Sequence, residues 1–103
     1  MLVLKTRKTS NSGIVTSEGT LLAANPARVS YKIQNLGQNP LFVREGSGAS
    51  VSNFDYILAA GTVNDDGKGA SYDSPEGQCY VGIITIAGTS PRAVGSYREE
   101  NAN

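Results

Sequence analysis

The chain has 103 residues, of which 39% are hydrophobic, and its nine basic and nine acidic side chains leave no net charge. One cysteine and no histidine exclude an intrachain disulfide and disfavour a structural zinc site. This length predicts one domain, and Val, Ile, Leu and Phe, 23 of 103 residues, supply only a thin core. Small domains with thin cores are commonly stabilised by association, so we expect an assembled protein.

The charges are distributed unevenly along the chain. Residues 1–44 carry six basic and one acidic side chain, whereas residues 45–103 carry three basic and eight acidic ones. This split suits complementary contacts between copies or with a partner, although scatter among so few charges gives the same pattern. The basic residues do not predict nucleic-acid binding, and no apolar segment is long enough for a membrane helix. The N-terminal apolar run is too short for a secretory signal, so we expect synthesis in a cytoplasm.

The first quarter of the chain has two interpretations. Residues 2–6 predict a short strand. Residues 7–25 are rich in Ser, Thr, Asn and Gly, and so long a structureless loop is unusual inside a compact domain. We therefore expect an extended arm, a pair of short edge strands, or a flexible segment that is ordered by contact.

The clearest β pattern runs from Arg28 to Val43. Apolar and polar residues alternate at its start, which predicts a strand with one buried face. Residues 35–40 contain the Gly and Pro of a tight turn, and the extended pattern resumes after them. We therefore predict a hairpin.

The second half contains short apolar runs separated by turn residues. We predict strands over residues 54–60, 78–87 (the longest) and 92–98. No window keeps a helical period, so the fold is predicted to be all-β: a small antiparallel β-sandwich or barrel of jelly-roll type with an extended N-terminal arm. The expected organisation is an N-terminal strand and arm (1–24), a β domain (25–98) and a polar C-terminal tail (99–103).

Few residues suggest chemistry. Without histidine the commonest general base is missing, and the carboxylates suggest no acid–base pair, so we predict neither enzyme activity nor a cofactor. Cys79 lies in a predicted strand among apolar residues, which favours a buried, inert thiol. Residues 64–69, Asn-Asp-Asp-Gly-Lys-Gly, offer oxygen ligands for calcium but lack the required spacing, and a turn is the better interpretation.

Tyrosines and two arginines have both a structural and a binding interpretation. Five tyrosines could form a sugar-stacking face, but four lie in predicted strands, where a scaffold role is the better interpretation. These residues are Tyr31, Tyr56, Tyr72, Tyr80 and Tyr97. Arg28 and Arg92 stand beside prolines at strand starts, where they contact a partner or, by default, pair with nearby carboxylates.

Three stretches resemble small virion proteins of tailed bacteriophages: residues 25–43, with Asn-Leu-Gly-Gln-Asn-Pro, residues 54–61, Phe-Asp-Tyr-Ile-Leu-Ala-Ala-Gly, and residues 86–92, Ile-Ala-Gly-Thr-Ser-Pro-Arg. The resemblance covers residues 25–98 and is a pattern of strands and turns. It implies a capsid decoration (cement) protein located in the virion. Its partners would be the major capsid protein and copies of itself, with a trimer among the candidate assemblies. A neck, tail or fibre component and a glycan-binding β module stay open as alternatives.

The predicted arm supplies most of the candidate interface. Its two apolar pairs are seven residues apart, so that each could fill a separate pocket on a neighbouring subunit. Residues 7–24 reach up to about 60 Å when extended, enough to cross onto an adjacent copy. The candidate interface residues are Ile14, Val15, Leu21, Leu22, Arg28 and Arg92.

Overall fold

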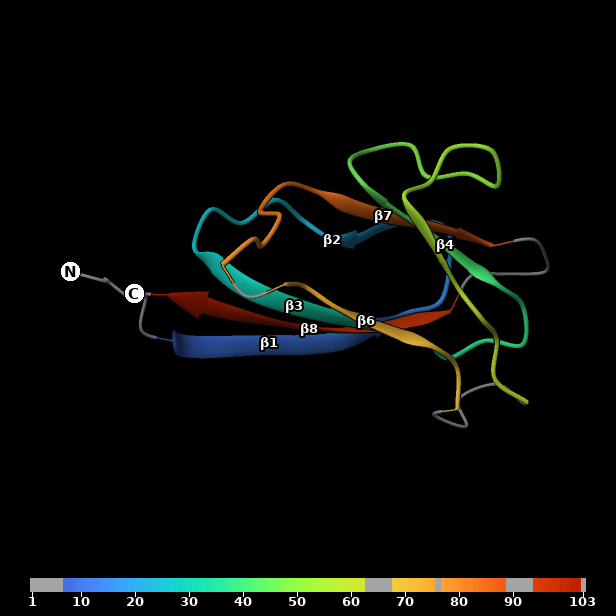
Figure 1. Ribbon diagram of the computed structural model, residues 1–103, viewed down its shortest axis with the longest axis horizontal. Helices are drawn as coiled ribbons and strands as arrows, with labels where there is room; N and C mark the ends of the chain where they lie inside the picture. The colour runs from blue at the N-terminus through green and yellow to red at the C-terminus, as the bar shows by residue number, and fades with distance from the viewer. Residues whose placement is uncertain (1–6, 63–67, 76, 89–93, 103) are drawn as a thin grey trace.

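The chain folds into two four-stranded antiparallel sheets that pack face to face (Figure 1). The computed structural model describes residues 7–62, 68–75, 77–88 and 94–102, and within them every regular element is a strand. The first sheet has the order β1-β8-β3-β6 and the second the order β2-β7-β4-β5. The strands are β1 (Arg7–Val15), β2 (Gly19–Leu22), β3 (Arg28–Asn35), β4 (Leu41–Glu45), β5 (Tyr56–Leu58), β6 (Ser71–Asp73), β7 (Ile84–Gly88) and β8 (Gly95–Ala102). The all-β sandwich prediction is confirmed.

The core lies between the sheets and is built from alternate residues of both. In β3 the side chains of Tyr31 and Ile33 are buried while Lys32 between them is exposed. Strands with one buried face fix their register, because a slip of one residue would move every apolar side chain to the surface. The buried cluster consists of Leu21, Leu22, Tyr31, Ile33, Leu41, Val43, Leu58, Ile84 and Ile86.

The predicted hairpin between residues 28 and 43 is wrong, because its two strands belong to different sheets. β3 pairs with β6 and β8, whereas β4 pairs with β5 and β7. Asn35 holds the connection: its buried side chain donates to the carbonyls of Asn39 (2.8 Å) and Leu58 (2.9 Å) and accepts from the Gly37 amide (2.8 Å). The buried amide thus replaces ladder hydrogen bonds that a hairpin would make.

The N-terminal segment is part of the sandwich. Of the three alternatives for residues 7–25, the pair of edge strands is the one that forms, since β1 and β2 are edges of the two sheets. The expected boundary after residue 24 therefore does not separate an arm from the β domain. The strand predicted over residues 2–6 lies outside the described residues.

The C-terminal half departs from prediction at the start of β7 and at the end of β8. The expected tail belongs to β8, which continues to Ala102 with Glu99 and Asn101 buried. β7 begins only at Ile84, so residues 78–83 are not strand, and β1 is the longest strand. The carbonyls of Tyr80 and Gly82 accept hydrogen bonds from Arg28 instead of a neighbouring strand, which accounts for the shortened β7.

Candidate functional site

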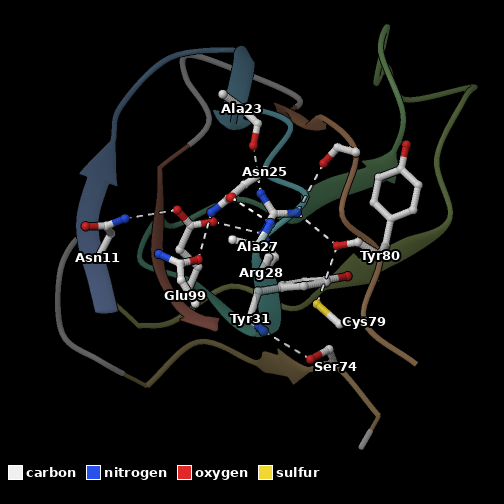
Figure 2. Close-up of polar contacts among 12 residues, drawn as sticks. Asn11, Ala23, Asn25, Ala27, Arg28, Tyr31, Ser74, Cys79, Tyr80 and Glu99 are labelled. Carbon is white, nitrogen blue, oxygen red and sulfur yellow. Dashed lines mark hydrogen bonds and ion pairs between the residues drawn. The ribbon is translucent and has the colours of Figure 1, made fainter. Parts of the chain in front are cut away.

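Arg28 is the centre of a buried polar network on the β1/β2 side of the sandwich (Figure 2). It begins β3 and is only 1% exposed. Its Nε donates to Glu99 Oε2 (2.8 Å), Nη1 to the carbonyls of Tyr80 (2.9 Å) and Gly82 (3.1 Å), and Nη2 to the carbonyl of Ala23 (2.7 Å). One guanidinium therefore joins β3, β8, the β2–β3 connection and the segment before β7. The default interpretation, pairing with a carboxylate, is what the geometry shows.

Glu99 is the counter-ion, and it reaches Arg28 across 71 residues of sequence. Its Oε1 also accepts from Asn11 Nδ2 of β1 (3.2 Å). Burial raises the pKa of Glu99, but hydrogen bonds from Arg28 and Asn11 outweigh burial and hold the pKa below its ordinary value. The carboxylate is therefore charged at neutral pH, as a buried arginine requires.

A groove of about 700 Å³ opens above this network, between the edges of the two sheets. Asn25 beside it donates to Asn101 Oδ1 (2.7 Å), which fixes the rim near the start of β3. The groove is lined by Ser10, Asn11, Ser12, Leu21, Leu22, Ala23, Ala24, Asn25, Tyr97 and Glu99. Its walls combine polar and charged side chains with two leucines, two alanines and the Tyr97 ring.

The opposite side of the sandwich is closed by tyrosines. Tyr56 of β5 and Tyr72 of β6 stack across the two sheets with ring centroids 4.3 Å apart, and Tyr31 lies 5.8 Å from Tyr72. The Tyr31 hydroxyl donates its one hydrogen to Glu45 Oε2 (2.5 Å). In the hydrogen bond between the two tyrosine hydroxyls (3.2 Å), Tyr56 is therefore the donor and Tyr31 the acceptor. Burial, followed by the contact with Glu45, raises the pKa of Tyr31, and burial raises that of Tyr56. A scaffold role suits these three rings.

An apolar patch occupies the outer face of the second sheet. Phe42 of β4 lies opposite Ile57 of β5, and because Leu41 and Val43 point into the core, this pair faces outward. Phe54 packs edge-on against Phe42 with centroids 5.1 Å apart. Ile57 is 49% and Phe54 37% exposed. We call Phe42, Phe54 and Ile57 the apolar patch.

Polar contacts hold the loop of residues 46–55, which carries Phe54, against the sheet. Arg44 donates to the Ser47 carbonyl (3.0 Å) and to Asn53 Oδ1 (2.7 Å). The Thr85 hydroxyl donates to the Gly46 carbonyl (2.7 Å), and Asp55 accepts from the Glu45 amide (2.6 Å). The apolar patch therefore sits on a fixed surface.

The predicted interface residues do not gather in one place. Leu21 and Leu22 are buried in this chain's own core, as Arg28 is, so the expectation that they reach pockets on a neighbour is wrong. Val15 packs partly against the core. Ile14 alone among the described candidates is largely exposed, at 60%, and Arg92 lies outside the described residues.

The other chemical candidates also stay apart from the groove and the apolar patch. Cys79 is half-buried, burial raises the pKa of its thiol, and Sγ donates to the Tyr80 carbonyl. Most of the Asn64–Gly69 segment lies outside the described residues. Within the described part of the chain no three acidic or cysteine side chains group as metal ligands. Sequence reasoning missed Glu99, Asn11 and Asn101, because nothing local marks a residue whose partner lies tens of positions away.

No family model, curated protein or solved structure matches this chain. Among the described residues no helix has the length and apolarity needed to cross a bilayer. Its function is therefore inferred from the surfaces described above.

Proposed function

We propose that this chain is a non-enzymatic structural protein of a tailed-phage particle, a capsid decoration protein that binds and stabilises the head shell. The observation that carries the proposal is the apolar patch, fixed on the outer face of a rigid sheet. The resemblance of residues 25–98 to small phage virion proteins supplies the kind of partner: the major capsid protein and other copies of the chain.

The apolar patch has the properties of a protein-binding surface. Two aromatic rings and an isoleucine lie together on a sheet face, and contiguous exposed apolar surface of this kind marks interaction sites. Phenylalanine is enriched at the buried centres of interfaces. Because the loop under Phe54 is already held by Arg44, Thr85 and Asp55, binding would cost little ordering of the backbone. A protein that binds only the assembled shell stabilises it by mass action.

The test is the composition of purified phage particles. Mass spectrometry should find the protein in roughly tens to hundreds of copies per particle, as shell symmetry requires. A few copies would favour a neck, tail or fibre component instead. Absence from the particles would end the proposal.

A second measurement tests the patch itself. Binding of the purified protein to shells that lack it should fall for Ile57→Ser and Phe54→Ser, by roughly tenfold each if the patch is the buried centre of the contact. Val81, 39% exposed and outside the patch, supplies the matched control as Val81→Ser. Equal binding by all three variants would show that the shell contact lies elsewhere.

A glycan-binding module is the second candidate, and the groove between β1 and β2 favours it. Asparagine, serine and glutamate side chains beside the Tyr97 ring are suitable partners for sugar hydroxyls and a sugar ring face. A glycan array should then show binding that Tyr97→Ala removes and Tyr72→Ala, on the opposite side of the sandwich, preserves. If the array shows no binding, the glycan-binding function is excluded and the structural role stands as the proposal.

A further inference from the structure

We propose that the outer edge of β1 pairs with the same edge of a second copy, in antiparallel and two-fold symmetric fashion, so that two four-stranded sheets become one. Four strands form the sheet edges: β1, β6, β2 and β5. β1 has nine residues, whereas the others have three or four. Short edges give a second strand little to pair with, but a long edge is a ready template for another chain. This inference concerns the free protein and does not depend on the proposed function.

The middle of β1 is built to let another strand approach. Residues 10–13 are Ser-Asn-Ser-Gly. The Tyr97 ring covers Gly13 and Asn11 donates to Glu99, whereas Ser10 and Ser12 are exposed, and no proline interrupts the strand. The pairing of β1 with β8 shifts only between Arg7 and Thr9 and is regular from there to Val15. Within the described residues β8 is the sole partner of β1, so its other edge is unpaired.

The regular stretch determines the register of the pair. Its centre is Ser12, so a two-fold axis there places Ser12 opposite the partner's Ser12 and Ser10 opposite the partner's Ile14. Every residue from Thr9 to Val15 then takes part in the new ladder. The contact also covers part of Ile14, the most exposed large apolar residue among those described.

The two-fold arrangement uses the same edge on both copies, so it requires no second kind of binding surface. A second copy is therefore the partner that this edge fits.

The test begins with the mass of the full chain in solution, measured by light scattering up to about 1 mM. We expect a monomer–dimer equilibrium. A monomer throughout, or a trimer, would overturn the proposal.

Cysteine cross-linking then tests the register, in a Cys79→Ser background so that only one thiol is present. Residues directly opposite in an antiparallel ladder have Cα atoms about 4.5 to 5.5 Å apart, within the range of a disulfide. Ser12→Cys should therefore give a covalent dimer under mild oxidation. Ser10→Cys is the matched control: it is equally exposed on the same strand, but the two copies of residue 10 would lie about 13 Å apart.

We expect Ser12→Cys to cross-link at least about tenfold faster than Ser10→Cys, because only the first thiol gains an effective concentration from the dimer. Circular dichroism of both variants checks that the sandwich is intact. Equal rates would mean that only random collisions bring the thiols together, and faster linking at Ser10 would mean a different register. Either result overturns the proposal.

Discussion

The two lateral sides of the sandwich are closed in different ways. On the β5/β6 side, Tyr56 and Tyr72 stack across the sheets and Tyr31 joins them through hydroxyl contacts with Glu45 and Tyr56. On the β1/β2 side, Arg28 and Glu99 form a buried ion pair beneath an open groove. The aromatic side divides its stabilisation among several rings, whereas the ionic side concentrates it in one guanidinium. The ionic side should therefore be far more sensitive to a single substitution.

Arg28→Met should have the largest effect. It removes four hydrogen bonds and leaves the Glu99 carboxylate buried without its counter-ion, so the free energy of unfolding should fall by about 3–5 kcal/mol. Urea denaturation followed by circular dichroism measures the loss. Arg44→Met is the control, because Arg44 bonds an exposed loop and should cost about 1 kcal/mol or less. Similar losses for both arginines would contradict the concentration of stability on the β1/β2 side.

Glu99→Gln should have the next largest effect, a loss of about 2–4 kcal/mol in the free energy of unfolding. Arg28 loses its counter-charge, while the side chain at position 99 keeps its shape. This variant also tests a pH dependence. The pKa of Glu99 lies below its ordinary value of 4.5 in the folded state, so the ion pair contributes stability above pH 4.5. That contribution is lost as the pH falls through the folded pKa. The free energy of unfolding of the wild type should therefore fall more steeply in acid than that of Glu99→Gln. An equally steep fall for both proteins would contradict a charged Glu99 in the folded state.

Tyr31→Phe should cost about 1–2 kcal/mol, because Glu45 and Tyr56 lose a hydrogen-bond partner while the ring stays in place. The dependence of the free energy of unfolding on pH in the alkaline range gives a second measurement. The folded pKa values of Tyr31 and Tyr56 lie above the ordinary 10.0, so their contribution is full below pH 10 and is lost as the pH rises through the folded values. Ultraviolet titration of tyrosinate should show these two rings ionising only as the protein unfolds. Ionisation of all tyrosines at their ordinary pKa in folded protein would count against the buried cluster.

Tyr72→Leu should have the smallest effect, about 0.5–1.5 kcal/mol, since the remaining rings and the core persist when one stacked ring is lost. A double-mutant cycle with Tyr56→Leu isolates the stacking term, because the two residues touch directly. Additive losses would mean that the rings contribute by burial alone.

The alternating pattern of β3 predicted its buried face, and the turn residues after it predicted a change of direction. Both predictions describe local properties, and both are correct. Whether the chain returns to the same sheet or crosses to the other depended on Asn35, whose buried amide bonds Asn39 and Leu58. A polar residue at the end of a strand gives no sign that its side chain will be buried, so the hairpin prediction was wrong.

The candidate site shows the same limit more sharply. Glu99 stands in a run of polar residues that we expected to be a tail, but its backbone pairs with β1 and β3 and its side chain bonds to Arg28. That contact joins residues 71 apart, and a periodicity confined to a short window carries no information about it. The apolar patch was equally hidden, because the sequence does not show which face of a sheet Phe42 and Phe54 occupy.

The strand order also governs when the protein can fold during synthesis. β7 and β8, the last two strands among the described residues, occupy interior positions of the two sheets. β1 is synthesised before β8, yet among the described residues β8 is its one partner, with Arg7 opposite Ala102 and Val15 opposite Gly95. At a synthesis rate of about 5–20 residues per second, β1 waits several seconds for its partner. We therefore expect β1 to stay unpaired until β8 has been synthesised, and chains that stop before β8 to remain targets for proteases and chaperones.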